Sequence, residues 1–385
     1  MQIDQYGFAK KKKRRLNMKI ILEKASKQFA QNLPFVLYKK PSNANVIGLF
    51  QKNDNLFLVQ DFTEKGFVFA TFDGKQTVII PENQSEFFCE ESNESQSNLL
   101  NDEVLFSDES HRGSFEKLVT KGIQAIENKE FEKVVLSRIE IVELNHFDLI
   151  TAFQNLVQFY PTAFTYCFYH PKVGIWLGAS PEQLLKSNGI DFHTIALAGT
   201  KKSNYFKEVS WKKKEIEEQQ IVTDYIVNKL KEAATDVIVS KPYNYRAGAL
   251  WHIKTEISGV VNSGIGLQKI IRLLHPTPAV CGLPKDASKA FILENEQYDR
   301  TFYTGFLGEL NCDDTKETEN SDLFVNLRCM QIEFSNAQND SKQILAKAIL
   351  YIGCGITKDS IPEKEWEESV SKSVTMKKIL DLRFY

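Results

Sequence analysis

The stretch that decides the fold reads FTYCFYHPKVGIWLGAS, from residue 164 to residue 180. Its aromatic and β-branched runs, 164–170 and 173–177, predict two strands with only Pro171 and Lys172 between them. Further strands are predicted at 133–138, 190–196, 302–308, 323–334 and 344–351. Because strands follow one another in runs and do not alternate strictly with helices, we predict an α+β fold with large antiparallel sheets.

Helices are predicted at 19–32, 147–159 and 210–233, and Ser114 is expected to cap another whose apolar residues follow the helical period. Closer to the N-terminus, strands at 46–50, 56–60, 67–72 and 76–80 predict an antiparallel meander. The polar segment 90–101 has no hydrophobic period and predicts a loop. We therefore expect an N-terminal β-rich subdomain over 18–100 and a second region over 101–385, packed together as one compact domain.

Length and composition place the chain among ordinary globular proteins. It has 385 residues, of which 42% are hydrophobic and 25% charged, and these values argue against disorder. Its apolar runs fall short of the roughly 18 residues of a membrane span, and no signal peptide is visible, so we expect a cytoplasmic protein without a membrane partner. The six cysteines lack metal-ligand spacing and indicate neither a zinc site nor a disulfide framework.

The first 17 residues differ from the rest in charge. Six consecutive basic residues, Lys10 to Arg15, stand there against one acid, Asp4. Such a cluster could bind an anionic surface or form a solvated tail, and we expect a disordered basic extension that ends before Met18. Apart from this segment nothing in the sequence suggests a nucleic-acid partner.

A charged helix is predicted near the C-terminus. Ser360-Ile361-Pro362-Glu363 has the pattern of a capping box with proline in the first turn. In the helix that follows, Glu365, Glu368 and Lys372 stand at positions i, i+3 and i+7 and share one face. That face is either a solvated charged surface or a site for a metal and an anion together, and these residues alone leave both interpretations open.

Three further charged residues are candidates for chemistry. Lys133 begins an apolar strand, where it is either an edge residue or a buried base with a depressed pKa. Glu182 follows a sharp turn that we expect to open a helix, where a carboxylate stabilises the helix dipole or, when buried, acts as an acid. Glu218 lies on an acidic helix and is either solvated or a ligand of Mg²⁺, which takes one or two carboxylates.

The remaining candidates each have an ordinary structural alternative. His252 could be a core histidine, and Gly353-Cys354-Gly355 a turn at a strand end. Arg328 is predicted within a strand of apolar residues, as an ion-paired side chain or as the receptor of an anionic ligand. A buried guanidinium needs an anion because it can hardly be neutralised.

Taken together, the residues resemble the chorismate-utilising enzymes, and most closely the isochorismate synthases. The resemblance covers about residues 113–380. It rests on the following motifs: Lys133-Val134-Val135-Leu136-Ser137-Arg138, Gly178-Ala179-Ser180-Pro181-Glu182, Leu197-Ala198-Gly199-Thr200, Leu250-Trp251-His252, Leu274-His275-Pro276-Thr277-Pro278-Ala279, Gly282-Leu283-Pro284, Leu327-Arg328-Cys329, Gly353-Cys354-Gly355 and the Glu365/Glu368/Lys372 helix.

The resemblance implies two large antiparallel sheets flanked by helices, with Mg²⁺ and chorismate bound between them. It implies that Lys133 activates water and that Glu182 protonates the departing hydroxyl. The other implied roles are Mg²⁺ ligation by Glu218, Glu365 and Glu368, binding of the two carboxylates by Arg328 and Lys372 with backbone N–H groups near Thr200 and Gly353, and a place beside the ring for His252.

A few positions distinguish the subfamilies. Anthranilate and aminodeoxychorismate synthases usually lack the lysine found here at Lys133, and the latter often have a lysine where Ala198 stands. Salicylate synthases share the lysine but tend to have threonine at the position of Ala279. The resemblance therefore implies an isochorismate synthase that adds water at C2 and loses the C4 hydroxyl, without an amidotransferase subunit. The alternatives are a salicylate synthase and an amidotransferase-dependent synthase subunit. The resemblance implies a role in menaquinone or siderophore biosynthesis, and the sequence does not distinguish between the two.

Overall fold

The computed structural model describes residues 18–92, 109–202, 209–247, 250–312, 319–334 and 346–380. The basic segment 1–17 and most of the polar segment 90–101 lie outside the described residues. Within the described residues the helices are α1 (Lys19–Ala30), α2 (Arg112–Glu127), α3 (Leu149–Phe159), α4 (Lys213–Leu230), α5 (Leu267–Leu274), α6 (Lys285–Asn295) and α7 (Pro362–Lys377), with a short 3₁₀ helix, η1 (Glu82–Gln84).

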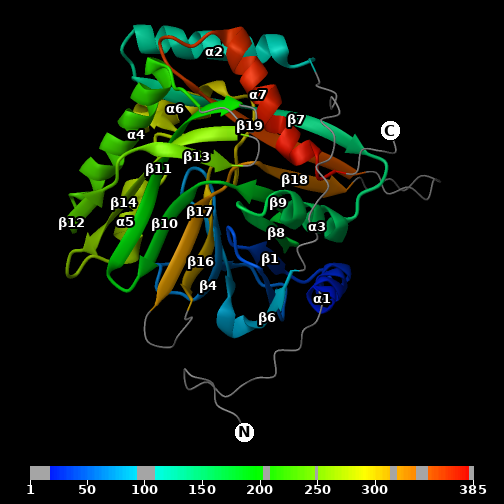
Figure 1. The fold of residues 1–385 in the computed structure, drawn as a ribbon. Coiled ribbons are helices and arrows are strands. Elements are labelled where there is room, and N and C mark those ends of the chain that lie inside the picture. Colours follow the sequence, from blue (N-terminus) through cyan, green and yellow to red (C-terminus); the bar gives the residue numbers. More distant parts are fainter. Residues whose placement is uncertain are drawn as a thin grey trace.

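The described strands form two antiparallel sheets (Figure 1). The nine-stranded sheet runs in the order β15 (Gly282–Leu283), β7 (Lys133–Leu144), β19 (Ala346–Ile356), β18 (Cys329–Phe334), β9 (Gly174–Ser180), β8 (Phe164–His170), β1 (Phe35–Lys39), β2 (Asn45–Gln51), β6 (Ser85–Glu91). The ten-stranded sheet runs in the order β12 (Ala234–Val239), β14 (Leu250–Val261), β11 (Asp191–Lys202), β10 (Gln183–Asn188), β17 (Asn320–Val325), β16 (Phe306–Cys312), β4 (Gly66–Ala70), β5 (Thr77–Pro81), β3 (Phe57–Leu58), and β13 (Tyr243–Ala247) pairs with β14.

The two sheets pack on each other through an aromatic layer. Strand β8 is buried on both faces, and its alternate residues Phe164, Tyr166 and Phe168 point into this layer. From the other sheet Phe69 and Phe324 meet them, with the rings of Phe164 and Phe324 stacked 4.3 Å apart. The predicted α+β fold with large antiparallel sheets is confirmed.

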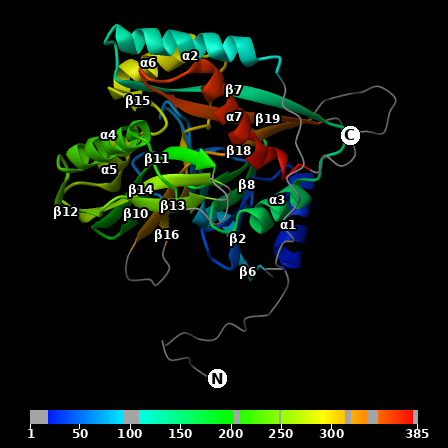
Figure 2. The same ribbon diagram turned by 45° about the horizontal axis from the view of Figure 1, so that its top comes forward.

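Helices cover the outer faces of both sheets (Figures 1 and 2). Helices α1 and α3 pack on the nine-stranded sheet, and α4 and α5 pack on the ten-stranded sheet. At one end of the molecule α2, α6 and α7 cluster over β7 and β19 around the buried Trp366. None of the helices in the described part of the chain is both long and apolar enough to cross a membrane.

The N-terminal strands do not form the expected separate meander. Strands β1, β2 and β6 extend the nine-stranded sheet through the pairing of β1 with β8, whereas β3, β4 and β5 extend the other sheet through the pairing of β4 with β16. The prediction of one meander is wrong because both partners, β8 and β16, lie far along the sequence. Such non-local pairing is not visible in local patterns.

Two predicted helix caps are also wrong. Ser114 lies inside the first turn of α2, where its hydroxyl donates to the carbonyl of His111, the residue that precedes the helix. Helix α7 does have Pro362 in its first turn, but its cap is Ile361 and no side chain caps it. The hydroxyl of Ser360 instead accepts a hydrogen bond from the amide of Thr357, which closes the preceding turn.

Candidate active site

A cavity opens where both sheets meet α4 and α7. The nine-stranded sheet contributes residues of β7 and β19 to its wall, and the ten-stranded sheet contributes residues of β11 and β14. Of the residues singled out in the sequence, the following line this cavity: Glu182, Glu218, His252, Ala279, Arg328, Gly353, Glu365, Glu368 and Lys372. Thr200 belongs to β11, but its side chain lies outside the described part of the structure.

The inner face of α7 carries the predicted charged set. Glu365 is buried, and its carboxylate lies within 4.8 Å of a carboxylate oxygen of Glu368 and of the thiol of Cys354. Lys372 donates to Glu368 Oε1 at 2.6 Å and to the carbonyl of Gly353 at 2.9 Å. Burial alone lowers the pKa of Lys372, but the adjacent Glu368 outweighs this effect and raises it. This face is therefore a partly enclosed array of charges, with Glu365 buried and Glu368 still in part exposed.

Lys133 begins β7 and is almost completely buried, with 1% of its side chain exposed. Its Nζ donates to Glu218 Oε1, on α4, at 2.8 Å. The backbone of β19 leaves room for this contact, because a Cβ added to Gly355 would lie 2.7 Å from Glu218 Oε1 and 3.3 Å from Lys133 Cε. The structure thus brings together Lys133 and Glu218, which are 85 residues apart in the sequence.

Glu182 lies in the connection between β9 and β10, and not at a helix N-terminus as expected. The connection leads into a strand because the carbonyl of Glu182 accepts from the amide of Val325, which ties this segment to β17. Burial raises the pKa of Glu182 to about 8, although the nearby positive charge of Lys133 acts in the opposite direction. At neutral pH the Glu182 side chain is therefore mostly a neutral acid.

Arg328 lies in the connection between β17 and β18, and not within a strand as predicted. Its φ of 48° is left-handed, a conformation that breaks the strand pattern and turns the chain at this point. Its Nη1 donates to Thr375 Oγ1 of α7 at 3.3 Å. Burial lowers the pKa of Arg328, but a guanidinium remains charged in proteins, so it presents a cation to the cavity.

His252 projects from β14 into the same cavity. Its Nδ1 donates to the carbonyl of Gly199 at 2.8 Å, since a carbonyl can only accept. Burial, together with the positive charge of Arg328, lowers the pKa of His252 to about 3. The ring is therefore neutral at physiological pH, and its hydrogen bond to Gly199 directs the unprotonated Nε2 as an acceptor.

The donor set suits a hard divalent cation. Carboxylate oxygens are the ligands that Mg²⁺ prefers, and it commonly takes one or two of them together with substrate and water. Glu365 and Glu368 lie next to each other on α7, and Glu218 faces the same cavity from α4. The thiol of Cys354 already donates to the carbonyl of Glu365 and is a soft ligand that Mg²⁺ does not favour.

Several residues of the cavity wall were not proposed as site residues from the sequence, although Val135 and Leu327 stand in the quoted motifs. Tyr303 and Tyr351 stack with ring centroids 5.4 Å apart, and Val135, Leu327 and Met376 supply apolar wall. A Cβ at Gly353 would lie 2.6 Å from the hydroxyl of Tyr303, so this glycine allows β19 to approach the ring. Apolar and aromatic residues of this kind fill every strand of the core, and no local signal separates those that line a cavity.

Comparison with known proteins agrees with this arrangement. Residues 66–381 match the family model described as chorismate binding enzyme. The chain belongs to this family. Isochorismate synthase EntC of Escherichia coli is 28% identical to this chorismate binding enzyme over 327 aligned residues, and the match covers 81% of the chain and 80% of the relative.

Two solved structures share the fold. MenF, the menaquinone-specific isochorismate synthase of Escherichia coli, superposes with a TM-score of 0.71 at 19% identity, over 90% of this chain and 89% of its own. Component I of anthranilate synthase from Streptococcus pneumoniae gives a TM-score of 0.62 at 17% identity, over 89% and 92%. The fold is therefore that of chorismate-utilising enzymes, and the chemistry has to be inferred from the site.

Proposed function

We propose that this chorismate binding enzyme is an isochorismate synthase that isomerises chorismate with the help of Mg²⁺. The observation that carries the proposal is a buried neutral carboxylic acid, Glu182, on the cavity wall, together with a buried lysine, Lys133, whose Nζ contacts Glu218 of the same wall. The reaction adds water at C2 and expels hydroxide from C4, so it needs both a base and an acid. The similarity to isochorismate synthase EntC of Escherichia coli supports the same reaction.

Each catalytic group has one role in this proposal. Lys133 Nζ accepts a proton from the water that attacks C2, and Glu182 donates its proton to the hydroxyl that leaves C4. A carboxyl group with a pKa of about 8 is a suitable acid because it holds its proton at neutral pH and can give it up during the reaction. Before the next turnover Lys133 releases the proton that it took to solvent, and Glu182 recovers one.

The positively charged residues of the cavity complement the negative charges of the two carboxylates of chorismate. Arg328 provides positive charge from the connection between β17 and β18, and Lys372 provides it from α7. Both side chains are largely enclosed by protein, which strengthens their attraction for an anion. Glu218, Glu365 and Glu368 would hold Mg²⁺, which supplies further positive charge at the ring carboxylate as charge develops there. His252, held neutral, would accept a hydrogen bond beside the ring.

Incubation of the purified protein with chorismate and Mg²⁺ tests the proposal. We expect a product of unchanged mass, without ammonium and without a second protein. The Lys133→Ala variant should lower kcat by about 10² to 10⁴-fold, the usual contribution of a positioned base. Release of pyruvate would instead identify a salicylate synthase, and a strict need for ammonium would identify an amine-transferring synthase. A fully active Lys133→Ala protein would refute the mechanism.

A further inference from the structure

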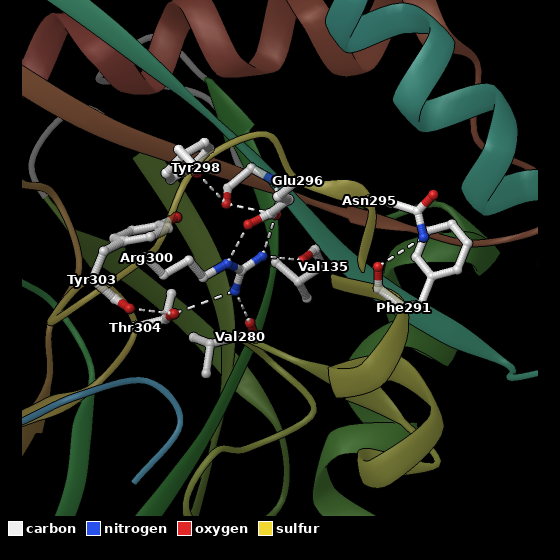
Figure 3. A network of polar contacts seen from close by, with 10 residues as sticks. Val135, Val280, Phe291, Asn295, Glu296, Tyr298, Arg300, Tyr303 and Thr304 are labelled. Carbon is white, nitrogen blue, oxygen red and sulfur yellow. Dashed lines mark hydrogen bonds and ion pairs between the residues drawn. The ribbon is translucent and has the colours of Figure 1, made fainter. Parts of the chain in front are cut away.

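A buried ion pair stands behind the wall of the cavity. Glu296 and Arg300 lie in the connection between α6 and β16 (Figure 3). Each has 1% of its side chain exposed. Arg300 Nε donates to Glu296 Oε2 at 2.7 Å, and Nη2 donates to Oε1 at 2.6 Å. Neither side chain lines the cavity. Burying two charges is costly even when they are paired. The role of this pair therefore lies in the backbone groups that the two side chains bind.

The pair continues the hydrogen-bond ladder of β7 where its neighbouring strand ends. Strand β15 pairs with residues 133 and 134 of β7, and the amide of Val135 makes the last backbone hydrogen bond on this side, to the carbonyl of Cys281 at 2.8 Å. Beyond it, Arg300 Nη2 donates to the carbonyl of Val135 at 2.6 Å, and Glu296 Oε1 accepts from the amide of Ser137 at 2.7 Å. The two side chains thus take the place of a neighbouring strand along this edge of β7. Without them the carbonyl of Val135 and the amide of Ser137 would lose these hydrogen-bond partners.

Arg300 also binds two other parts of the wall. Its Nη1 donates to the carbonyl of Val280 at 3.0 Å and to Thr304 Oγ1 at 3.3 Å (Figure 3). With Glu296 and Val135 these contacts engage every N–H direction of the guanidinium. Val135, Val280 and Thr304 all line the cavity. A lysine has a single nitrogen and cannot make this planar set of contacts.

We propose that the Glu296–Arg300 pair is a positioning unit for the isomerisation. It fixes the edge of β7, which carries Lys133, against the segments that carry Val280 and Thr304, so that the base faces the substrate at a constant place. The pair touches no reacting atom and acts through Lys133. This inference rests on the proposed function. A displacement of a catalytic group by about 1 Å can cost on the order of 10²-fold in rate.

The Arg300→Lys variant tests the proposal because it keeps the positive charge beside Glu296 but loses most of the contacts to the wall. We expect kcat to fall by about tenfold to 10²-fold per folded molecule while KM for chorismate stays within about twofold. Amide hydrogen exchange should accelerate at Val135 and Ser137 and stay unchanged in β8. Should this variant fail to fold, Ser137→Ala removes the hydroxyl contacts to Glu296 Oε1 at 2.8 Å and to the hydroxyl of Tyr298 at 2.6 Å but keeps the backbone contact of Ser137 to Glu296, and it should lower kcat about threefold.

Glu309→Gln serves as the matched control. Glu309 is a buried carboxylate that accepts from the hydroxyl of Tyr38 at 2.6 Å and pairs with Lys40, and none of these three residues lines the cavity. This variant should lose thermal stability with kcat unchanged. The proposal is overturned if Arg300→Lys keeps the wild-type kcat per folded molecule, if Glu309→Gln lowers kcat equally, or if exchange at Val135 and Ser137 does not change.

The two proposals fail in different ways. If the wild-type protein does not isomerise chorismate, the proposed function is wrong. The exchange measurement needs no substrate, so unchanged protection of Val135 and Ser137 in Arg300→Lys would overturn the positioning role by itself, even in an active enzyme.

Discussion

Glu182 shows how burial of one side chain can create an acid. In the unfolded chain its pKa is near 4.5, and in the folded protein burial raises that pKa to about 8. Between these two values the folded state binds one proton more than the unfolded state. The free energy of unfolding therefore falls as pH rises, by about 1.4 kcal/mol per pH unit from this group.

Glu182→Gln is expected to abolish turnover and to remove this slope. Glutamine is neutral in both states, so the stability of the variant relative to the wild type should increase by about 3 kcal/mol from about pH 5.5 to about pH 7.5. Urea unfolding at both pH values measures the difference. Parallel pH–stability curves would mean that Glu182 is ionised in the folded protein. In the wild type, kcat should decline as pH rises above about 8, where the acid loses its proton.

At the scale of elements, the position of α7 depends on charges buried beneath it. Glu140 of β7 accepts from Arg138 Nη1 at 3.1 Å and pairs with Lys377 of α7, while Arg138 Nε donates to Ser369 Oγ of α7 at 2.8 Å. The guanidinium of Arg138 also lies 4.4 Å from the ring of Trp366. Helix α7 is thus held on β7 by buried residues that lie beside the face that carries Glu365 and Glu368.

Glu140→Gln is expected to destabilise the protein by about 3–5 kcal/mol because it leaves two buried cations without their anion. The double variant Glu140→Gln/Lys377→Met should recover part of this loss, since one of these cations is then gone. Glu143→Gln is the matched control: Glu143 lies on the same strand, β7, and pairs with Lys347 of β19, but both side chains are exposed. It should change stability by less than about 1 kcal/mol. Equal effects of Glu140→Gln and Glu143→Gln in urea unfolding would contradict this view of α7.

What the sequence could predict depends on how local each feature is. The shared face of Glu365, Glu368 and Lys372 follows from helical spacing, and the strand at Lys133 follows from its β-branched neighbours. The sequence identifies Glu182 and Arg328 as candidates, but the secondary structure predicted for each is wrong. Both lie in turns between two strands, and such a turn resembles a helix start at Glu182 and a strand interior at Arg328. Glu296 and Arg300 were missed altogether. Their spacing is typical of a helix surface, and only the fold places them at the edge of β7.

At the scale of the molecule, the cavity joins the two sheets, so a ligand bound there stabilises the fold as a whole. Its wall includes β7 and β19 from one sheet, β11 and β14 from the other, and helices α4 and α7. A ligand that binds only the folded state adds about 2.7 kcal/mol at a concentration of 100 times its Kd. Chorismate and Mg²⁺ added together should therefore raise the Tm of the wild type by several degrees, and by more than the two separate shifts combined, because each supplies charge that the other needs.

Glu368→Gln should remove this cooperative part of the stabilisation. The variant loses a charged ligand of the cation but keeps the packing of α7, because Glu368 is the more exposed member of its ion pair with Lys372, with 34% of its side chain exposed against 14%. Its Tm without ligands should thus stay close to that of the wild type, while its joint shift with chorismate and Mg²⁺ falls to that with chorismate alone. Thermal unfolding with each ligand and with both measures this. A joint shift as large as in the wild type would place the cation away from Glu368.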